Sequence, residues 1–338
     1  MPFDQNTCVI FAKRPEGMVS AEQFRLSSGP VPEPAEGQIL IRTIYLSLDP
    51  YMRGRMNDRK SYVPPFQVGE VLEGGVIGEV VASRNSKFAE GDIVTGMLGW
   101  QSYSLSDGAG LARLDRRLAP LPCFLGVLGM PGMTAWAGLL KIGQPKEGES
   151  VFVTAASGAV GSIVGQIAKL KGCRVAGCAG SDAKVDYLTS ELGFDAAFNY
   201  KTCDSLSRAM AEACPGGIDV YFENVGGRFF EAALTNMNPF GRMPVCGLIA
   251  EYNAETPPEG PRGFFQVVTK RLHIAGFIVS DHFADMPRFI TEAAGWLREG
   301  KLKHHETIVE GLENAPQAFV GLFLGENFGK LLVQVGPE

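Results

Sequence analysis

Short apolar runs alternate with polar and glycine-rich positions through the first third of the chain. Between residues 6 and 120, runs such as GQILIRTIYLSLDP and VGEVLEGGVIGEVVASRN place apolar side chains at every second position. This period is typical of strands that bury one face. The pattern therefore predicts a compact β-barrel domain in this part of the chain.

From about residue 148 the pattern changes to short Val, Ile and Ala runs that alternate with amphipathic helical stretches. That alternation indicates a parallel α/β sheet, and six strands suffice for a doubly wound dinucleotide-binding fold. The strands are expected at 151–154, 173–178, 196–199, 218–222, 242–247 and 273–279. Helices at 284–299 and 312–324 precede a last strand at 330–335. We expect domains at 1–125 and 126–300, with 301–338 returning to the first.

The segment VFVTAASGAVGSIVGQIAKLKG contains a strand, a tight turn and a helix in that order. It is an A-x-G-x-x-G version of the dinucleotide fingerprint, in which Gly158 lets the backbone approach a pyrophosphate and Gly161 lets helix and strand pack closely. The helix N-terminus would face the phosphates, so Gly158, Ala159, Val160 and Gly161 are candidate binding residues. The alternative is a turn that serves helix packing alone.

The end of the second strand distinguishes the two nicotinamide cofactors. Enzymes that use NAD place an acid there to hold the ribose 2′-hydroxyl, but this chain has Gly180 and Ser181 at that point. Lys184 could balance a 2′-phosphate, although Asp182 opposes it and a solvated lysine is the plain alternative. The sequence favours NADP(H).

Composition and charge exclude several classes of protein. Apolar residues make up 45% of the chain and charged residues 20%, and 31 basic residues against 37 acidic ones give a net charge of −6. These values predict a globular protein without an electrostatic footprint for nucleic acid or an anionic membrane. The apolar run 118–140 contains three prolines, which argue against a membrane span. Seven scattered cysteines and no visible targeting segment predict a reduced, cytoplasmic location.

Potential metal ligands are scarce. The four histidines stand at 273, 282, 304 and 305, and the chain has no C-x-x-C pair. A zinc dehydrogenase would need a Cys, His and Glu ligand set in its β-domain, so we expect no metal. The chain also lacks the G-x-S-x-G and H-E-x-x-H motifs of hydrolases.

Several segments together resemble the zinc-independent medium-chain dehydrogenase/reductases, in the branch of prostaglandin reductases, alkenal double-bond reductases and curcumin reductases. These segments are LSLDPYMRGRM, LGVLGMPGMTAWAGL, the turn and second strand at 155–184, FNYKT, FENVGG and GENFGK. The resemblance implies a GroES-like β-domain beside a Rossmann domain, NADPH-dependent reduction of an activated carbon–carbon double bond, and a homodimer.

The resemblance also implies a set of site residues. Lys184 and Tyr200 would contact the 2′-phosphate, Asn224 would lie next to the cofactor, and Tyr252 and Tyr51 would lie near the substrate carbonyl. The nicotinamide side would be flanked by Cys246, Gly247, Tyr252, Phe277, Ile278 and Val279, and Asn327 would reach back to the cofactor. Each of these tyrosines and asparagines could instead be a boundary or turn residue.

Hydride attack on the β-carbon of an enone or enal moves negative charge to the carbonyl oxygen, where a hydrogen-bond donor stabilises it. Tyr252, together with a cofactor ribose hydroxyl, is the candidate donor. The alternatives are a quinone oxidoreductase on the same scaffold and an NADPH-binding protein without turnover. Glu251, next to Tyr252, leaves the substrate preference open.

Overall fold

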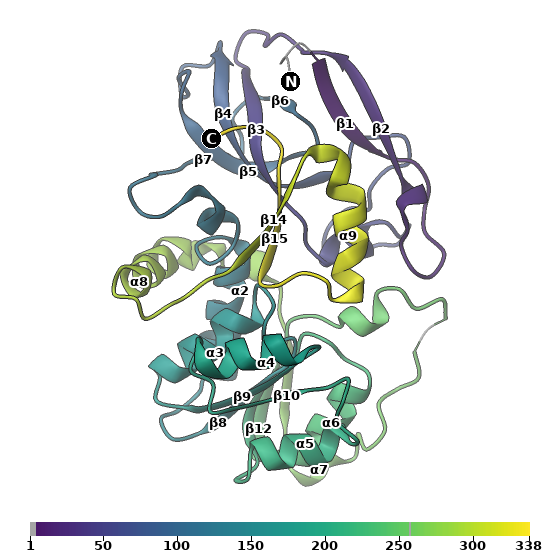
Figure 1. The fold of residues 1–338 in the computed structure, drawn as a ribbon, viewed down its shortest axis with the longest axis vertical. Helices are drawn as coiled ribbons and strands as arrows, with labels where there is room; N and C mark the ends of the chain where they lie inside the picture. The colour runs from purple at the N-terminus through teal and green to yellow at the C-terminus, as the bar shows by residue number, and fades with distance from the viewer. Residues whose placement is uncertain (1–4, 257) are drawn as a thin grey trace. The chain divides into compact units, whose positions relative to one another are not determined.

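The computed structural model describes residues 5–256 and 258–338, and the chain divides into two compact units (Figure 1). Unit 1 contains the described residues up to 125 together with 306–327 and 331–338. Unit 2 contains residues 126–305 and 328–330.

Unit 2 is built on a six-stranded parallel sheet with the order β10-β9-β8-β11-β12-β13. Its strands are β8 (Ser150–Val153), β9 (Arg174–Ala179), β10 (Ala196–Asn199), β11 (Ile218–Phe222), β12 (Met237–Val245) and β13 (His273–Gly276). All four residues of β8 are buried, as expected of a central strand covered on both faces. The strand order reverses between β8 and β11, which is where doubly wound sheets bind ligands.

Helices connect the successive strands of this sheet. They are α3 (Gly161–Leu170), α4 (Asp182–Ser190), α5 (Leu206–Ala213) and α6 (Arg228–Asn236). Ser181 and Ser205 precede α4 and α5, and each hydroxyl accepts a hydrogen bond from the backbone N–H three residues on. These serines satisfy helix-end donors that would otherwise lack a partner within the helix.

Unit 1 is an antiparallel β-domain (Figure 1), in which the buried strand β3 (Ile39–Ser47) pairs with β4 (Glu73–Ser83), β6 (Tyr103–Ser106) and β15 (Lys330–Gln334). Its other elements are β1 (Gln5–Phe11), β2 (Phe24–Pro30), α1 (Tyr51–Arg55), β5 (Ile93–Gly99), β7 (Ala112–Arg113), β14 (Glu306–Glu310) and α9 (Ala315–Leu324). The predicted α/β class, a Rossmann sheet plus a GroES-like β-domain, is confirmed.

The core of unit 1 is aromatic at its centre. Trp100 stacks on Phe24 with ring centroids 6.0 Å apart, and its ring meets the edge of Phe319 from α9 at 5.8 Å. Trp100 and Phe319 are almost completely buried. Offset and edge-on aromatic pairs of this kind stabilise a core beyond the area they bury. The return of the chain as α9 therefore completes the core of the β-domain.

The strand expected at 273–279 is too long. β13 ends at Gly276, and Val279 already begins a 3-10 turn (Val279–Asp285). Phe277 leaves the strand because its ring packs on the edge of Phe222, with ring centroids 6.3 Å apart. A Cβ atom at Gly138 would lie 2.4 Å from the tip of the same ring, so this glycine makes room for it.

The chain returns to unit 1 at Glu306 rather than at residue 301. The side chain of Gln166 on α3 explains the difference, because its amide donates to the Lys303 carbonyl at 2.9 Å and accepts from the Lys303 N–H at 2.7 Å. Residues 301–305 are thereby held to unit 2.

No helix in the described part of the chain is long and apolar enough to cross a bilayer. The apolar run 118–140 forms a 3-10 turn (Leu121–Leu125), the helix α2 (Met130–Ala137) and the start of a π-helical turn (Gly138–Gly143). These short elements are consistent with the prolines that interrupt the run.

Candidate functional site

The glycine-rich segment after β8 forms a tight turn that leads into α3. Ala155 adopts a left-handed backbone conformation with φ +47°, and the Gly158 N–H donates to its carbonyl oxygen at 2.9 Å. A Cβ atom at Gly161 would lie 2.4 Å from that oxygen, so only glycine allows this contact between turn and helix. The close packing expected of Gly161 is present. The N–H groups of Ser162, Ile163 and Val164 donate to the carbonyls of Gly158 and Val160, so the start of α3 is bonded back to this turn.

A distant part of the chain lies against this turn. Residues 328–330 belong to unit 2, and the Gly329 N–H donates to the Ser157 carbonyl at 3.0 Å while Gly158 and Gly329 form an isolated parallel bridge. Gly329 has φ +66°, and a Cβ there would lie 2.0 Å from the His305 carbonyl oxygen. The predicted site residue Asn327 directly precedes this segment and is the last residue of its stretch in unit 1.

The end of β9 carries a cluster of lysine and tyrosine side chains instead of an acid. A Cβ atom at Gly180 would lie 2.9 Å from the Tyr200 hydroxyl oxygen and 3.3 Å from Cε of Lys201. Burial lowers the pKa of Lys184, and the positive charge of Lys201 lowers it further. Tyr200 and Lys201 thus both border Gly180, and Lys184 lies within electrostatic reach of Lys201.

The opposing charge at this strand end is held by a neighbour. The side chain of Asn199 donates from Nδ2 to the Asp182 carboxylate at 2.8 Å. Asp182 also occupies the first turn of α4, where the helix dipole favours a negative charge. The negative charge of Asp182 is therefore stabilised locally, by the Asn199 side chain and by the N-terminus of α4.

Asn224 ties the end of β11 to the end of β8. Its backbone N–H donates to the Thr154 hydroxyl at 2.9 Å, and its side-chain amide donates to the Thr154 carbonyl at 2.8 Å. Gly226 and Gly227, with φ of +82° and +54°, complete the turn into α6. Asn224 thus links β11 to β8 through two hydrogen bonds to Thr154. Its side-chain oxygen is a hydrogen-bond acceptor that these two bonds do not use.

The loop after β12 brings three predicted residues together. The N–H groups of Cys246 and Gly247 donate to the Glu223 carbonyl at 2.9 and 3.2 Å. Tyr252 follows a 3-10 turn (Ile249–Glu251), and its hydroxyl oxygen accepts from the Leu248 N–H at 3.4 Å. A Cβ at Gly247 would lie 2.9 Å from that hydroxyl oxygen. The Tyr252 hydroxyl therefore lies over the same loop as Cys246 and Gly247.

The remaining nicotinamide-side candidates follow β13. Phe277 packs against Phe222, as described above, while Ile278 is extended and Val279 begins the 3-10 turn. These three residues therefore leave the sheet edge as an irregular segment.

Tyr51 is the first residue of α1 and belongs to unit 1, whereas Tyr252 belongs to unit 2. The Tyr51 ring packs against the core of unit 1, and burial raises the pKa of its hydroxyl, with the Asp49 carboxylate raising it further. Asp49 is itself buried and accepts a hydrogen bond from Ser47. The Tyr51 hydroxyl is therefore a neutral donor at any ordinary pH.

Two site residues escape the sequence patterns. Lys201 stands in a loop, where no periodicity marks it, and only its position next to Tyr200 could have indicated it. Glu223 is completely buried at the end of β11, although a lone glutamate beside a glycine-rich turn predicts an exposed side chain.

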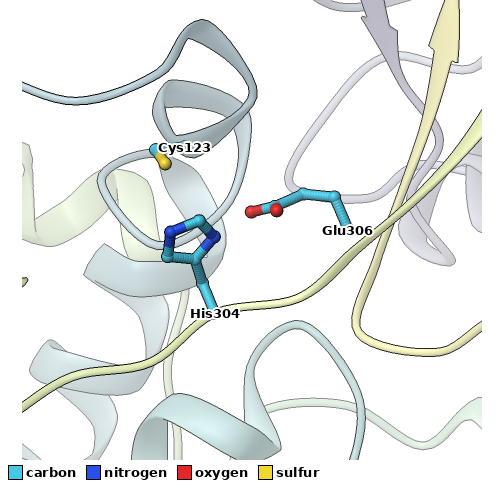
Figure 2. A group of neighbouring side chains, drawn as sticks. All are labelled: Cys123, His304 and Glu306. Carbon is cyan, nitrogen blue, oxygen red and sulfur yellow. The ribbon is translucent and has the colours of Figure 1, made fainter.

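Figure 2 shows Cys123, His304 and Glu306, the one group of potential metal ligands found among the described residues. Cys123 and Glu306 belong to unit 1, and His304 belongs to unit 2. Since the group does not lie within either unit, we assign it no metal.

Two family models match the chain. The model described as the N-terminal domain of oxidoreductase matches residues 7–114, and the one described as zinc-binding dehydrogenase matches residues 159–295. In the described residues of this second stretch, no three Cys, His, Asp or Glu side chains gather as potential ligands. The residues present there do not fit the zinc that the second description implies.

Similar proteins cover the whole chain. The NADPH-dependent curcumin reductase of Escherichia coli is 48% identical over 97% of this chain and 96% of its own length. The NADP-dependent 2-alkenal reductase of Nicotiana tabacum is 46% identical over 91% of this chain and 90% of its own length. The crystal structure of CurA from Vibrio vulnificus in complex with NADPH superposes with a TM-score of 0.93 at 46% identity, covering 98% of this chain and all of that chain.

We expect the purified protein to contain far less than one zinc per chain, because the described part of neither unit holds a ligand set. Elemental analysis after dialysis measures this directly. A chelator should leave the melting temperature unchanged, since no structural metal would be removed. One zinc per chain that survives dialysis, with a fall in melting temperature when it is extracted, would contradict the prediction.

Proposed function

The chain belongs to the zinc-independent medium-chain dehydrogenase/reductases and is an NADP-dependent oxidoreductase. From this premise we propose that it reduces the carbon–carbon double bond of α,β-unsaturated ketones or aldehydes. The observation that carries the proposal is similarity along the full chain to a curcumin reductase and a 2-alkenal reductase. The lysine and tyrosine cluster at the end of β9 supports the choice of cofactor.

The residues of unit 2 fit a bound NADP(H). In this proposal the turn 158–161 holds the pyrophosphate, and Lys184 and Tyr200 bind the 2′-phosphate, with Lys201 within electrostatic reach of Lys184. Around the nicotinamide side we place Cys246, Gly247, Tyr252, Phe277, Ile278 and Val279. We place Asn224 and Asn327 as further contacts to the cofactor. When bound, the cofactor supplies the hydride that the reduction consumes.

Tyr252 is the proposed catalytic donor. A hydroxyl aimed at the substrate carbonyl oxygen stabilises the negative charge that gathers there when the β-carbon is attacked. The Tyr252 hydroxyl lies over the loop of Cys246 and Gly247, where it accepts from the Leu248 N–H, and a phenol can donate its proton to a carbonyl oxygen. Tyr51, whose burial keeps it neutral, is the second candidate, and a cofactor ribose hydroxyl would assist.

We further propose that the partner of this enzyme, besides its small-molecule substrate, is a second copy of the chain. β13 is the last strand of the described sheet and pairs only with β12 in it. Its residues are half-buried or exposed, and an unprotected strand edge invites pairing. A two-fold axis at this edge would continue both sheets.

Light scattering at micromolar concentration should therefore give the mass of two chains. The prediction follows from the edge alone and needs neither substrate nor cofactor. A monomer that persists as the concentration is raised would contradict it.

A cytoplasmic location remains part of the proposal. It is supported by the odd number and wide scatter of the seven cysteines, which suit a reducing compartment. Fractionation of the cells that make the protein tests it.

We expect NADPH to bind far more tightly than NADH, and Lys184→Ala to narrow the difference. A charge-assisted hydrogen bond of about 1.5–3 kcal/mol corresponds to a roughly ten- to hundredfold change in Kd. Fluorescence titration of both cofactors measures it. Lys171→Ala, an exposed lysine after the end of α3, is the matched control and should change neither affinity. Equal affinity of the unaltered protein for NADPH and NADH would refute the assignment.

The product of an α,β-unsaturated ketone should be the saturated ketone, with deuterium from labelled NADPH on the β-carbon. Tyr252→Phe should lower turnover by about a hundredfold while leaving the NADPH affinity nearly unchanged, because the lost donor acts mainly in the transition state. Product analysis by NMR and steady-state kinetics provide the two readouts.

The control is Tyr45→Phe, whose hydroxyl donates to Glu338 at 2.8 Å within unit 1 and has no role in the proposal. Deuterium on the carbonyl carbon would show that the reaction is a carbonyl reduction. If only quinones consume NADPH, the enzyme is a quinone oxidoreductase. A silent Tyr252→Phe would move the donor to Tyr51 or to the ribose.

A further inference from the structure

One carboxyl group lies wholly inside unit 2, at the carboxyl end of β11. Glu223 follows the last residue of the strand, Phe222, and none of its surface is exposed. Buried carboxyl groups of this kind need hydrogen bonds from several directions, because solvent cannot reach their oxygens. The neighbours of Glu223 provide them.

Four donors face the Glu223 carboxyl. The Val225 N–H donates to Oε1 at 2.7 Å, the Thr154 hydroxyl lies 3.0 Å from the same oxygen, and the Tyr221 hydroxyl donates to Oε2 at 3.1 Å. The Gly226 N–H is the fourth donor. Burial raises the pKa of this carboxyl, and the four hydrogen bonds lower it. The two oxygens therefore act as acceptors that fix the backbone of the following turn.

The same residue joins the ends of three adjacent strands. Thr154, which contacts the carboxyl, follows β8 and also holds both amide groups of Asn224. The backbone N–H of Glu223 donates to Pro244 in β12 at 3.0 Å, and its carbonyl accepts from Cys246 and Gly247. β8, β11 and β12 are neighbours in the sheet, and the strand order reverses between the first two.

From these contacts we infer that Glu223 is a positioning residue for the reductase. Its carboxyl sets the turn that follows Asn224, and its backbone carbonyl holds the loop that carries Cys246 and Gly247. Both segments border the cofactor in the function proposed above, on which this inference rests. Its carboxyl acts through hydrogen-bond geometry, as an acceptor for the N–H groups of Val225 and Gly226. Loss of these acceptors frees the turn and weakens NADPH binding.

The chain offers a matched control on the same strand. Asp219 lies near the amino end of β11, where its carboxylate accepts from the Ser150 N–H at 2.8 Å and from the Asn238 side chain at 2.8 Å. It thus links β11 to β8 and β12 as Glu223 does, but at the edge of the sheet away from the proposed site. A role in strand pairing alone would make the two carboxyl groups equivalent.

The experiment compares Glu223→Leu, Glu223→Gln and Asp219→Leu in the full chain, by NADPH fluorescence titration and thermal melting without any enone. We expect Glu223→Leu to weaken NADPH binding by roughly tenfold or more, because the unpaired N–H groups no longer have a fixed position. Glu223→Gln keeps one oxygen for Val225 and Gly226 and offers its NH₂ to the Tyr221 hydroxyl, so its Kd should stay within about threefold of the original.

Asp219→Leu should lower the melting temperature as Glu223→Leu does, but leave the NADPH Kd within about threefold. If Glu223→Leu does not fold, Thr154→Val removes one donor to the carboxyl and the acceptor of the Asn224 N–H in a side chain of similar shape. It should weaken binding by roughly three- to tenfold.

Three results would overturn the inference. The first is an unchanged NADPH Kd in Glu223→Leu, or in Thr154→Val if that variant replaces it. The second is a loss of NADPH affinity in Asp219→Leu equal to that in Glu223→Leu, and the third is a Glu223→Gln that binds NADPH as weakly as Glu223→Leu. The last would mean that charge rather than acceptor geometry matters. Failure of the proposed function would give a different result: the unaltered protein would bind NADPH normally, but none of the enones tested would cause it to oxidise NADPH.

Discussion

The contact between Gly161 and the carbonyl of Ala155 is the constraint on which the nucleotide-binding half of the molecule depends. A Cβ at Gly161 would lie 2.4 Å from that oxygen, and one at Gly165, a turn later in α3, would lie 2.0 Å from the ring of Phe194. Any side chain at either position would therefore push α3 away from the sheet. The turn itself holds Ala155 in the left-handed region, which costs about 1–2 kcal/mol for a residue other than glycine. Packing of α3 has to offset that cost.

With α3 held so close, the ends of β8, β9 and β11 have little room, and polar groups rather than apolar ones complete them. Thr154 follows β8 and bonds to Asn224 and Glu223, while the Tyr200 hydroxyl occupies the space beside Gly180 after β9. Between these ends the strands are apolar and buried. The middle of the sheet is thus apolar and buried, and polar side chains gather at the carboxyl ends of its strands, where doubly wound folds bind ligands.

The sequence predicted the strands of unit 2 because short apolar runs between helical stretches leave few alternatives, and the dinucleotide turn because its glycines stand at fixed spacing. It did not predict where β13 ends, since the departure of Phe277 depends on the gap at Gly138, which is distant in sequence. It also missed Glu223 and Lys201, whose importance comes from neighbours that only the fold supplies. Periodicity reports burial within one element, and it carries no information on side chains that meet between elements.

The expected preference for a phosphorylated cofactor has a proposed physical origin beyond the missing acid. Lys184 is partly buried near Lys201, and both burial and this second positive charge lower the pKa of Lys184. A lowered lysine pKa means that the folded protein disfavours the charged form of Lys184, and an anion placed beside it would favour that form again. In the proposed site that anion is the 2′-phosphate. In the proposed site a cofactor with a free 2′-hydroxyl would leave the half-buried Lys184 without a counter-charge, and an acid at position 180 would meet the Tyr200 hydroxyl. In this proposal, the attraction of Lys184 for a 2′-phosphate favours one cofactor, and the positive charges of Lys184 and Lys201 without a counter-charge disfavour the other.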